Sequence, residues 1–127
     1  MCKDLKIKYV PKYFTNEEFK RASPACSLSD MSPAFMIELE KAREEAGVPF
    51  VVVSAFRTVE HELKRGRPGT SSHCKGCAID LRCSDSATRL KILNALLSVG
   101  FRRIGINKAF IHVDADYSKP QCIWLYD

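Results

Sequence analysis

The sequence predicts a single α+β domain with a small, largely antiparallel sheet flanked by two main helices. Two capped stretches, 32–47 and 84–100, carry apolar residues at helical spacing. Short apolar or alternating runs are typical of strands, and they lie at 50–53, 77–82, 101–106, 109–114 and 122–126. Only two residues separate the third run from the fourth, which indicates a hairpin. A length of 127 residues favours one domain, 1–127.

The N-terminal part predicts an arm and a short helix. Residues 5–10 alternate between polar and apolar side chains, so we expect 1–13 to form an N-terminal arm or an edge strand. Thr15 is a candidate N-cap, and Glu18 stands at the position of a capping box. Two phenylalanines flank the box as a hydrophobic staple: Phe14 and Phe19.

The first long helix has clear boundaries. Ser32 is the expected N-cap with Pro33 in the first turn, and Gly47 ends the helix. One apolar stripe is expected to be buried: Phe35, Leu39, Ala42 and Ala46. The continuous apolar run 50–53 then predicts a central strand covered on both faces, which leads into Ser54–Thr58.

The second half of the chain alternates between strands and one further long helix. Residues 59–72 predict a short helical piece around Glu60 and a mobile loop, which can form a wall beside a site. Residues 77–82 suit a short strand. The next helix is capped within 84–86 and closed by Gly100. Its buried face is predicted from one row of apolar residues: Ala87, Leu90, Leu93, Leu96 and Leu97.

Composition narrows the classes of partner. The net charge of +5 is compatible with a cell-wall or a nucleic-acid partner and requires neither. The sequence lacks a basic stripe with interleaved aromatic residues, the pattern that would indicate nucleic-acid binding. It also lacks an apolar run long enough to span a membrane. The N-terminus has no apolar signal-peptide core, so synthesis in a cytosol is expected, with retention there unless something else releases the protein.

Six cysteines invite a disulfide interpretation, but without an export signal free thiols are expected. Cys74 and Cys77 form a C-x-x-C motif that suits zinc or redox exchange, and Cys83 would be a third thiolate. A structural zinc finger needs a second close pair of ligands, which is absent from the sequence, so buried or bystander thiols are the favoured interpretation.

Two separate stretches indicate a metal site. His73 and Asp80 lie on either side of Gly76, which rules out one continuous helix between them, and His112 lies in a later apolar run. We predict that these three residues bind one metal ion. Two imidazoles and one carboxylate suit zinc and leave a fourth position for water, as in catalytic sites. His61, in a charged segment, is expected to be solvated.

These residues belong to a pattern that resembles a known family. The matching elements are Ser54-Ala55-Phe56-Arg57-Thr58, Ser71-x-His73-x-x-Gly76-x-Ala78-x-Asp80, Phe110-Ile111-His112-Val113-Asp114 and Trp124. In order and spacing they resemble zinc D-alanyl-D-alanine carboxypeptidase-like peptidases, which share a fold with the hedgehog signalling domain. The chain looks most similar to the short peptidase-like proteins of small single-stranded DNA phages, from about Phe14 to its C-terminus.

The resemblance implies a function. Zinc would be held by the three predicted ligands, and Arg57 would stabilise the oxyanion. Ser71 and Trp124 would contact substrate. The activity would be hydrolysis of peptide bonds in bacterial peptidoglycan stem peptides or cross-links, of carboxypeptidase or endopeptidase type. The chain is expected to act as a monomer at the cell wall, with no nucleic-acid or membrane partner.

One departure from the family leaves the general base open. Many relatives carry Glu or Asp three residues before the last histidine ligand, where this chain has Ala109. Asp114 is expected on the same face as His112, either as the base or as the partner that orients His112. Glu60 or Glu62 could serve instead. If none reaches the metal, the alternative is a zinc-containing, catalytically weak peptidoglycan-binding module.

Overall fold

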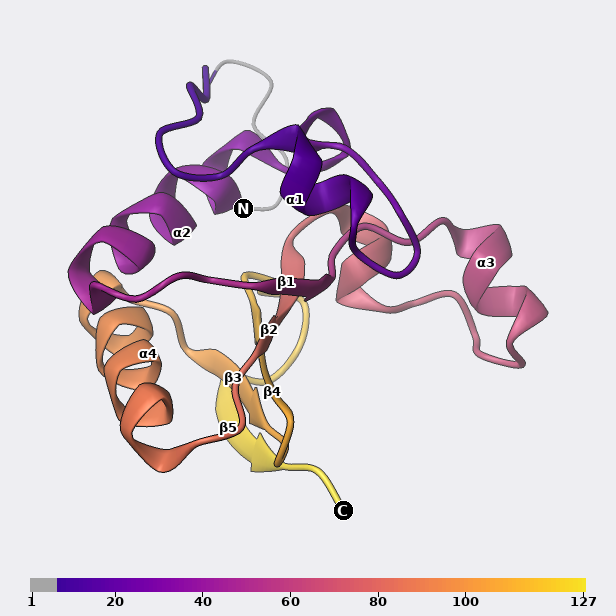
Figure 1. Ribbon diagram of the computed structural model, residues 1–127. Helices are drawn as coiled ribbons and strands as arrows, with labels where there is room; N and C mark the ends of the chain where they lie inside the picture. The colour runs from indigo at the N-terminus through magenta and orange to yellow at the C-terminus, as the bar shows by residue number, and fades with distance from the viewer. Residues whose placement is uncertain (1–6) are drawn as a thin grey trace.

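Five strands form one mixed sheet, in the order β1-β2-β4-β3-β5, in the computed structural model, which describes residues 7–127 (Figure 1). Their bounds are β1 Val52–Ser54, β2 Ala78–Arg82, β3 Arg103–Ile106, β4 Phe110–Asp114 and β5 Cys122–Leu125. Neighbours pair antiparallel except β3 and β5, which are parallel. The α+β prediction is therefore confirmed, with a correction at the last strand. The chain reverses after β4, so β5 could pair antiparallel only with β4. Both edges of β4 are already paired with β2 and β3, and β5 therefore pairs with the free edge of β3, to which it is parallel.

The expectation that run 50–53 forms a central strand is wrong, because β1 lies at one edge of the sheet. Val51 is 40% exposed, whereas Phe50 is fully buried. The Phe50 ring packs against the Phe14 ring, with 6.4 Å between centroids, so the continuous apolar run fits a local aromatic cluster. The segment after the first helix covers part of the β1 edge, since the Ser23 N–H donates to the Val53 carbonyl at 2.9 Å.

The described part of the N-terminal arm, residues 7–13, is held on the helix 33–46 and does not join the sheet. Residues 7–10 form no strand, and the rest of the predicted strand 5–10 lies outside the described residues. The buried Glu40 carboxylate accepts hydrogen bonds from the Tyr9 hydroxyl at 2.7 Å and from the Lys12 and Tyr13 N–H groups, each at 2.9 Å. The arm is therefore anchored by hydrogen bonds to one carboxylate, and not by the backbone hydrogen bonds of a paired strand.

The first helices begin and end as predicted. In α1, Asn16–Lys20, the capping box of Thr15 and Glu18 is present, and the two staple rings meet at 5.9 Å. A short 3-10 turn, Leu28–Asp30, follows it. The next helix, α2, runs from Pro33 to Ala46 and ends at Gly47, whose φ of 68° is in the left-handed region that favours glycine.

The last long helix, α4, spans Ser86–Val99 with Asp85 as its N-cap, and packs beside α2 on one face of the sheet (Figure 1). Its predicted buried face is only partly correct. Leu90 is 61% and Leu97 is 38% exposed, whereas Ile92, Ala95 and Leu96 are buried. Because the helix carries apolar residues all round, several stripes are similarly hydrophobic, and contact with α2 and the sheet selects one of them.

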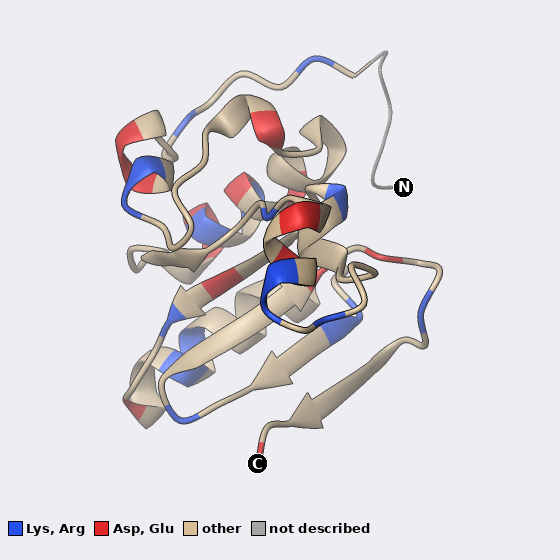
Figure 2. Ribbon diagram, turned by 90° about the vertical axis from the view of Figure 1, so that its right-hand side faces the viewer, with Lys and Arg blue, Asp and Glu red and all other residues tan. Residues whose placement is uncertain are grey.

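The two faces of the sheet have different chemistry. Side chains alternate along each strand, so one face carries a row of buried aliphatic residues that joins the core under α2 and α4: Ile79, Leu81, Ile104, Ile111 and Val113. The other face carries polar residues. Helix α3, Val59–Lys64, and the loop after it lie over this polar face, seen in front of the sheet in Figure 2.

Acidic and basic residues are interspersed along the ribbon (Figure 2). Among the described residues, no helix combines the length and hydrophobicity that crossing a membrane requires.

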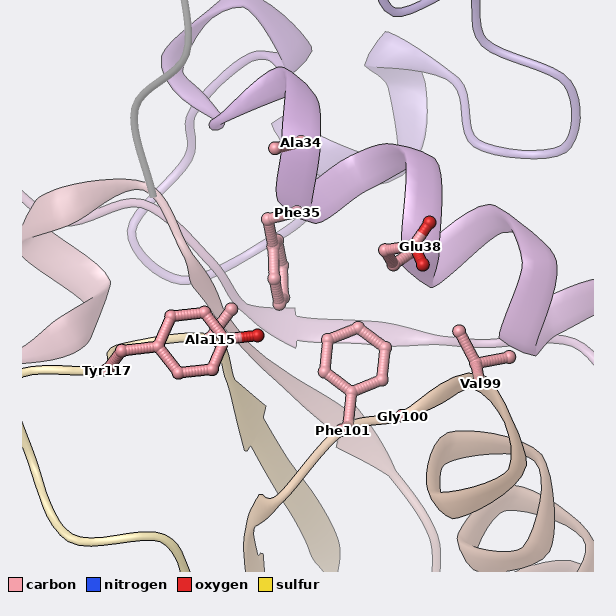
Figure 3. A pocket seen from close by; sticks show the side chains of 8 residues that line it. All are labelled: Ala34, Phe35, Glu38, Val99, Gly100, Phe101, Ala115 and Tyr117. Carbon is pink, nitrogen blue, oxygen red and sulfur yellow. The ribbon is translucent and has the colours of Figure 1, made fainter. Parts of the chain in front are cut away.

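A cavity of about 130 Å³ opens between α2, the end of α4 and the segment after β4 (Figure 3). Its lining contains none of the predicted site residues: Ala34, Phe35, Glu38, Val99, Gly100, Phe101, Ala115 and Tyr117.

Candidate metal centre

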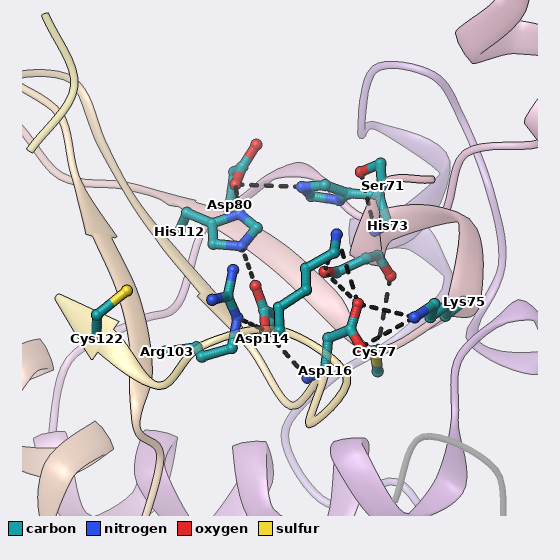
Figure 4. Close-up of polar contacts among 12 residues, drawn as sticks. Ser71, His73, Lys75, Cys77, Asp80, Arg103, His112, Asp114, Asp116 and Cys122 are labelled. Atoms are coloured by element: carbon teal, nitrogen blue, oxygen red, sulfur yellow. Dashed lines mark hydrogen bonds and ion pairs between the residues drawn. The ribbon is translucent and has the colours of Figure 1, made fainter. Parts of the chain in front are cut away.

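Three elements bring His73, Asp80 and His112 together on the polar face of the sheet. His73 comes from a short 3-10 helix, η2, Ser72–Lys75, and the other two lie opposite each other on β2 and β4. Asp80 Oδ1 is 2.9 Å from His112 Nδ1 and 3.5 Å from His73 Nε2. One ligand atom from each residue fits within a span of 4.8 Å, and all three residues are buried (Figure 4). Two nitrogens and one oxygen at this separation fit the donor set of a zinc ion with an open position.

The orientation of His73 is set by the backbone around it. Its Nδ1–H donates to the Ala55 carbonyl at 2.6 Å, which leaves the Nε2 lone pair facing the other two residues. Ser71 is the N-cap of η2, and its hydroxyl accepts from the His73 N–H at 3.2 Å. It ends at Gly76, where φ is 72° and an added Cβ would lie 2.6 Å from the Asp30 carbonyl oxygen. Only glycine fits this turn between η2 and β2.

His112 lies between two carboxylates. Its Nε2–H donates to Asp114 Oδ2 at 2.7 Å, so Nδ1 is the atom that faces Asp80. Burial lowers the pKa of His112, but the hydrogen bonds to Asp114 and Asp80 raise it by more than burial lowers it. The net shift of the pKa is upward. Burial raises the pKa of Asp80, yet hydrogen bonds from both histidines outweigh burial and hold it well below its usual range. A carboxylate on each side of the ring therefore favours its protonated form when no metal is bound.

Asp114 occupies the position of the orienting partner rather than that of a base. Its second oxygen, Oδ1, accepts from Arg103 Nε at 2.7 Å and from the Asp116 N–H at 3.0 Å. The carboxylate is almost fully buried on the side of His112 opposite the ligand atoms. Both carboxylate oxygens are thus engaged in hydrogen bonds. Of the two roles considered from the sequence, general base and orienting partner of His112, this favours the second.

Arg57 lies beside the three residues. Its Nε donates to the Ser54 hydroxyl at 3.0 Å, and its two terminal nitrogens lie 3.5 Å from Asp80 Oδ2 and 3.6 Å from Glu62 Oε2. The guanidinium is thereby fixed between the candidate metal ligands and α3. A fixed positive charge at this position can stabilise negative charge on a substrate oxygen.

A cleft of about 450 Å³ opens over the site. It is lined by Arg57, Glu62, Arg67, Pro68, Gly69, Thr70, Ser71, His73, Asp80, Phe110, His112, Lys119 and Tyr126. The loop after α3 forms one wall, as the sequence predicted. Of the two glutamates considered as the base, Glu62 lines the cleft and Glu60 does not. Glu60 is exposed and forms an ion pair with Lys64 at 3.2 Å.

Glu62 is buried within α3, and Arg67 Nη1 donates to its Oε2 at 2.8 Å. Burial raises the pKa of Glu62, but the hydrogen bond from Arg67 and the charges of Arg57 and Arg67 outweigh burial, and the net shift is downward. Glu62 is therefore ionised at neutral pH, which is the protonation state that a general base requires.

Trp124 supports the site from β5. Its ring lies 5.4 Å from that of His112, and the Arg103 guanidinium stacks over it at 4.9 Å. Gly105 makes this possible, because a Cβ there would lie 2.6 Å from the indole. The expected substrate contact of Trp124 stays a prediction, since the structure shows it packed against a candidate ligand. Ser71, by contrast, does line the cleft.

The cysteines within residues 7–127 are not part of this centre. Cys26, Cys74, Cys83 and Cys122 are free thiols, as expected. Cys77 is disulfide-bonded, so the expectation of free thiols is wrong at this residue. The C-x-x-C motif is therefore not a pair of zinc thiolates.

Sequence reasoning missed three groups around the centre. Lys119 and Tyr126 line the cleft, and Asp116 is a buried carboxylate below it. Asp116 and Lys119 are single polar residues in a segment without periodicity, so no sequence signal distinguished them from solvated side chains. Tyr126 stands two residues after Trp124 in the predicted strand 122–126, so strand alternation could have placed both on one face.

A family model described as peptidase M15 matches residues 12–114 of the chain. No curated protein and no solved structure gives a significant match. The matched range contains His73, Asp80, His112 and Arg57, and it ends before β5.

Proposed function

The chain belongs to the peptidase M15 family, and from this premise we propose that it is a zinc-dependent peptidase that hydrolyses peptide bonds in bacterial peptidoglycan. The observation that carries the proposal is the convergence of His73, Asp80 and His112 at the base of a cleft beside Arg57. Their donor atoms fit zinc, and each imidazole already has its other nitrogen engaged.

The residues of the cleft divide the chemistry between them. Bound zinc would supply a Lewis acid and a water of lowered pKa. Arg57 stabilises the negative charge that develops on the scissile carbonyl oxygen. Glu62 accepts the proton of the attacking water and passes it to the leaving amine. Asp114 keeps the proton of His112 on Nε2, so that Nδ1 stays available as a ligand.

The substrate proposed is a stem peptide or a cross-link of the cell wall, cut in carboxypeptidase or endopeptidase manner. The protein would act as a monomer, at the wall, and without nucleic-acid or membrane partners. A relationship to the peptidase-like proteins of small single-stranded DNA phages stays a prediction.

The test is release of new amino groups from purified peptidoglycan and from a synthetic stem pentapeptide, together with the zinc content per chain. We expect one zinc per chain and measurable release, both lost in His112→Ala. His61→Ala is the matched control, because His61 is the one histidine outside the cleft lining, and it should retain both. Release that survives His112→Ala would refute the proposed site.

A second candidate function follows from Ala109. At this position many members of the resembled family carry an acidic base, and in this chain Asp114 is engaged elsewhere. The alternative is a zinc-containing module that binds peptidoglycan without efficient turnover. One zinc per chain and retention on peptidoglycan, with no amine release at any pH, would favour it.

A further inference from the structure

A buried carboxylate below the candidate metal centre belongs to no role described so far. Asp116 is 1% exposed and lies in the segment between β4 and β5, beyond the range that the family model matches. Its oxygens accept from the Ser72 hydroxyl at 2.8 Å and from Lys75 Nζ at 2.9 and 3.0 Å. Ser72 directly precedes His73, and Lys75 ends the same 3-10 helix.

The same residue is tied to the other histidine. The Asp116 N–H donates to Asp114 Oδ1 at 3.0 Å, and Asp114 Oδ2 accepts from His112 Nε2 at 2.7 Å. Hydrogen bonds therefore run without interruption from His112 through Asp114 to Asp116 (Figure 4), and from Asp116 to Ser72. His73 and His112 lie on separate segments, and this network joins those segments below the site.

The charges strengthen the connection. Lys75 and Lys119 both approach Asp116, the second at 3.5 Å, and Lys119 Nζ also donates to the Thr70 carbonyl and the Ser72 hydroxyl. Burial raises the pKa of Asp116, but hydrogen bonds from Ser118, Lys75 and Ser72 outweigh burial and hold it below its usual range. The ionised carboxylate thus draws η2, the cleft wall and the segment after β4 together.

We propose that Asp116 is a positioning residue for the metal centre, which holds η2 so that His73 stays within ligand distance of Asp80 and His112. The proposal rests on the proposed function only in taking these three residues as zinc ligands. Without Asp116, η2 would keep its cap at Ser71 and the bond from Lys119 to Ser72, but it would lose its hydrogen-bonded connection to Asp114 and so to His112.

The test measures metal binding and not peptidase activity. Zinc dissociation constants are obtained by competition with a chromophoric chelator, and the visible spectrum of the Co²⁺-substituted protein reports ligand geometry. We expect Asp116→Ala to raise the zinc Kd by about tenfold and to change the Co²⁺ bands, because partners of metal ligands typically contribute this much. Asp116→Asn, which keeps one acceptor oxygen, should recover part of the loss.

The matched control is Glu40→Ala. Glu40 is also a buried carboxylate with several hydrogen bonds, but it holds the N-terminal arm on α2. This variant should lower the melting temperature and leave the zinc Kd and the Co²⁺ spectrum unchanged. An equal loss of zinc affinity in Glu40→Ala would mean that any destabilisation weakens the site, and would overturn the proposal.

Wild-type zinc affinity and an unaltered Co²⁺ spectrum in Asp116→Ala would also overturn it. If that variant does not fold, Ser72→Ala decides: the proposal requires a several-fold weaker zinc affinity, and an unchanged affinity contradicts it. A wild-type chain that binds zinc tightly but cuts no peptidoglycan would refute the peptidase and leave the positioning role intact. A wild-type chain that binds no zinc would overturn both.

Discussion

Asp114→Asn separates the two roles that the sequence left open for Asp114. The substitution keeps the shape of the side chain but replaces one acceptor oxygen by an NH₂ donor. Three donors surround the native carboxylate: His112 Nε2, Arg103 Nε and the Asp116 N–H. An asparagine oxygen turned toward Arg103 and Asp116 satisfies two of them, and its NH₂ then faces His112.

That orientation forces a change on His112. The ring must accept at Nε2, so its proton moves to Nδ1, the atom that faces Asp80 at 2.9 Å. A protonated Nδ1 has no lone pair for a metal. We therefore expect the zinc Kd to rise by about 10- to 100-fold, the usual effect of losing the partner of a ligating histidine. The hydrogen bond from Arg103 is kept, but its acceptor loses the negative charge, which should cost a further ~1–2 kcal/mol of unfolding free energy.

The assay is chelator competition for zinc at neutral pH, with urea unfolding of the zinc-free protein alongside. Asp85→Asn is the control, since Asp85 is the exposed N-cap of α4 and Asn caps helices equally well. An Asp114→Asn variant that binds zinc like the wild type while losing turnover would refute the orienting role and restore Asp114 as the base.

Three further outcomes are expected. Glu62→Gln should lower turnover by roughly 10²–10⁴-fold at unchanged zinc content, and near-normal turnover would exclude Glu62 as the base. Gly105→Ala should displace Trp124, the one tryptophan of the chain, and cost ~1–3 kcal/mol in urea unfolding. A red-shifted emission of the folded protein would report the displacement, and an unchanged spectrum and stability would contradict it. Asp116 has a lowered pKa, so it stabilises the fold above the ordinary Asp pKa of about 3.9 and loses this contribution as pH falls through its folded-state pKa. The unfolding free-energy difference between wild type and Asp116→Asn should therefore be constant near neutral pH and shrink below about pH 4; a difference independent of pH would count against it.

Local features of the chain were predictable where residues close in sequence decide the structure. The capping box at Thr15, the boundaries of α2 and the turn between β3 and β4 depend on a few neighbouring side chains. The shared face of His112 and Asp114 followed from strand periodicity alone. The central position of β1 and the buried stripe of α4 were predicted wrongly, because both depend on which distant surface covers the segment.

The sequence by itself determined the chemistry available: two imidazoles, a carboxylate and an arginine in segments whose local structure could be predicted. The tertiary structure alone decided that Asp80 lies opposite His112, that Asp114 lies outside the cleft lining, and that Asp116 reaches Ser72. Strand register and the packing of loops arise from contacts between residues far apart in the chain, and no local spacing encodes them.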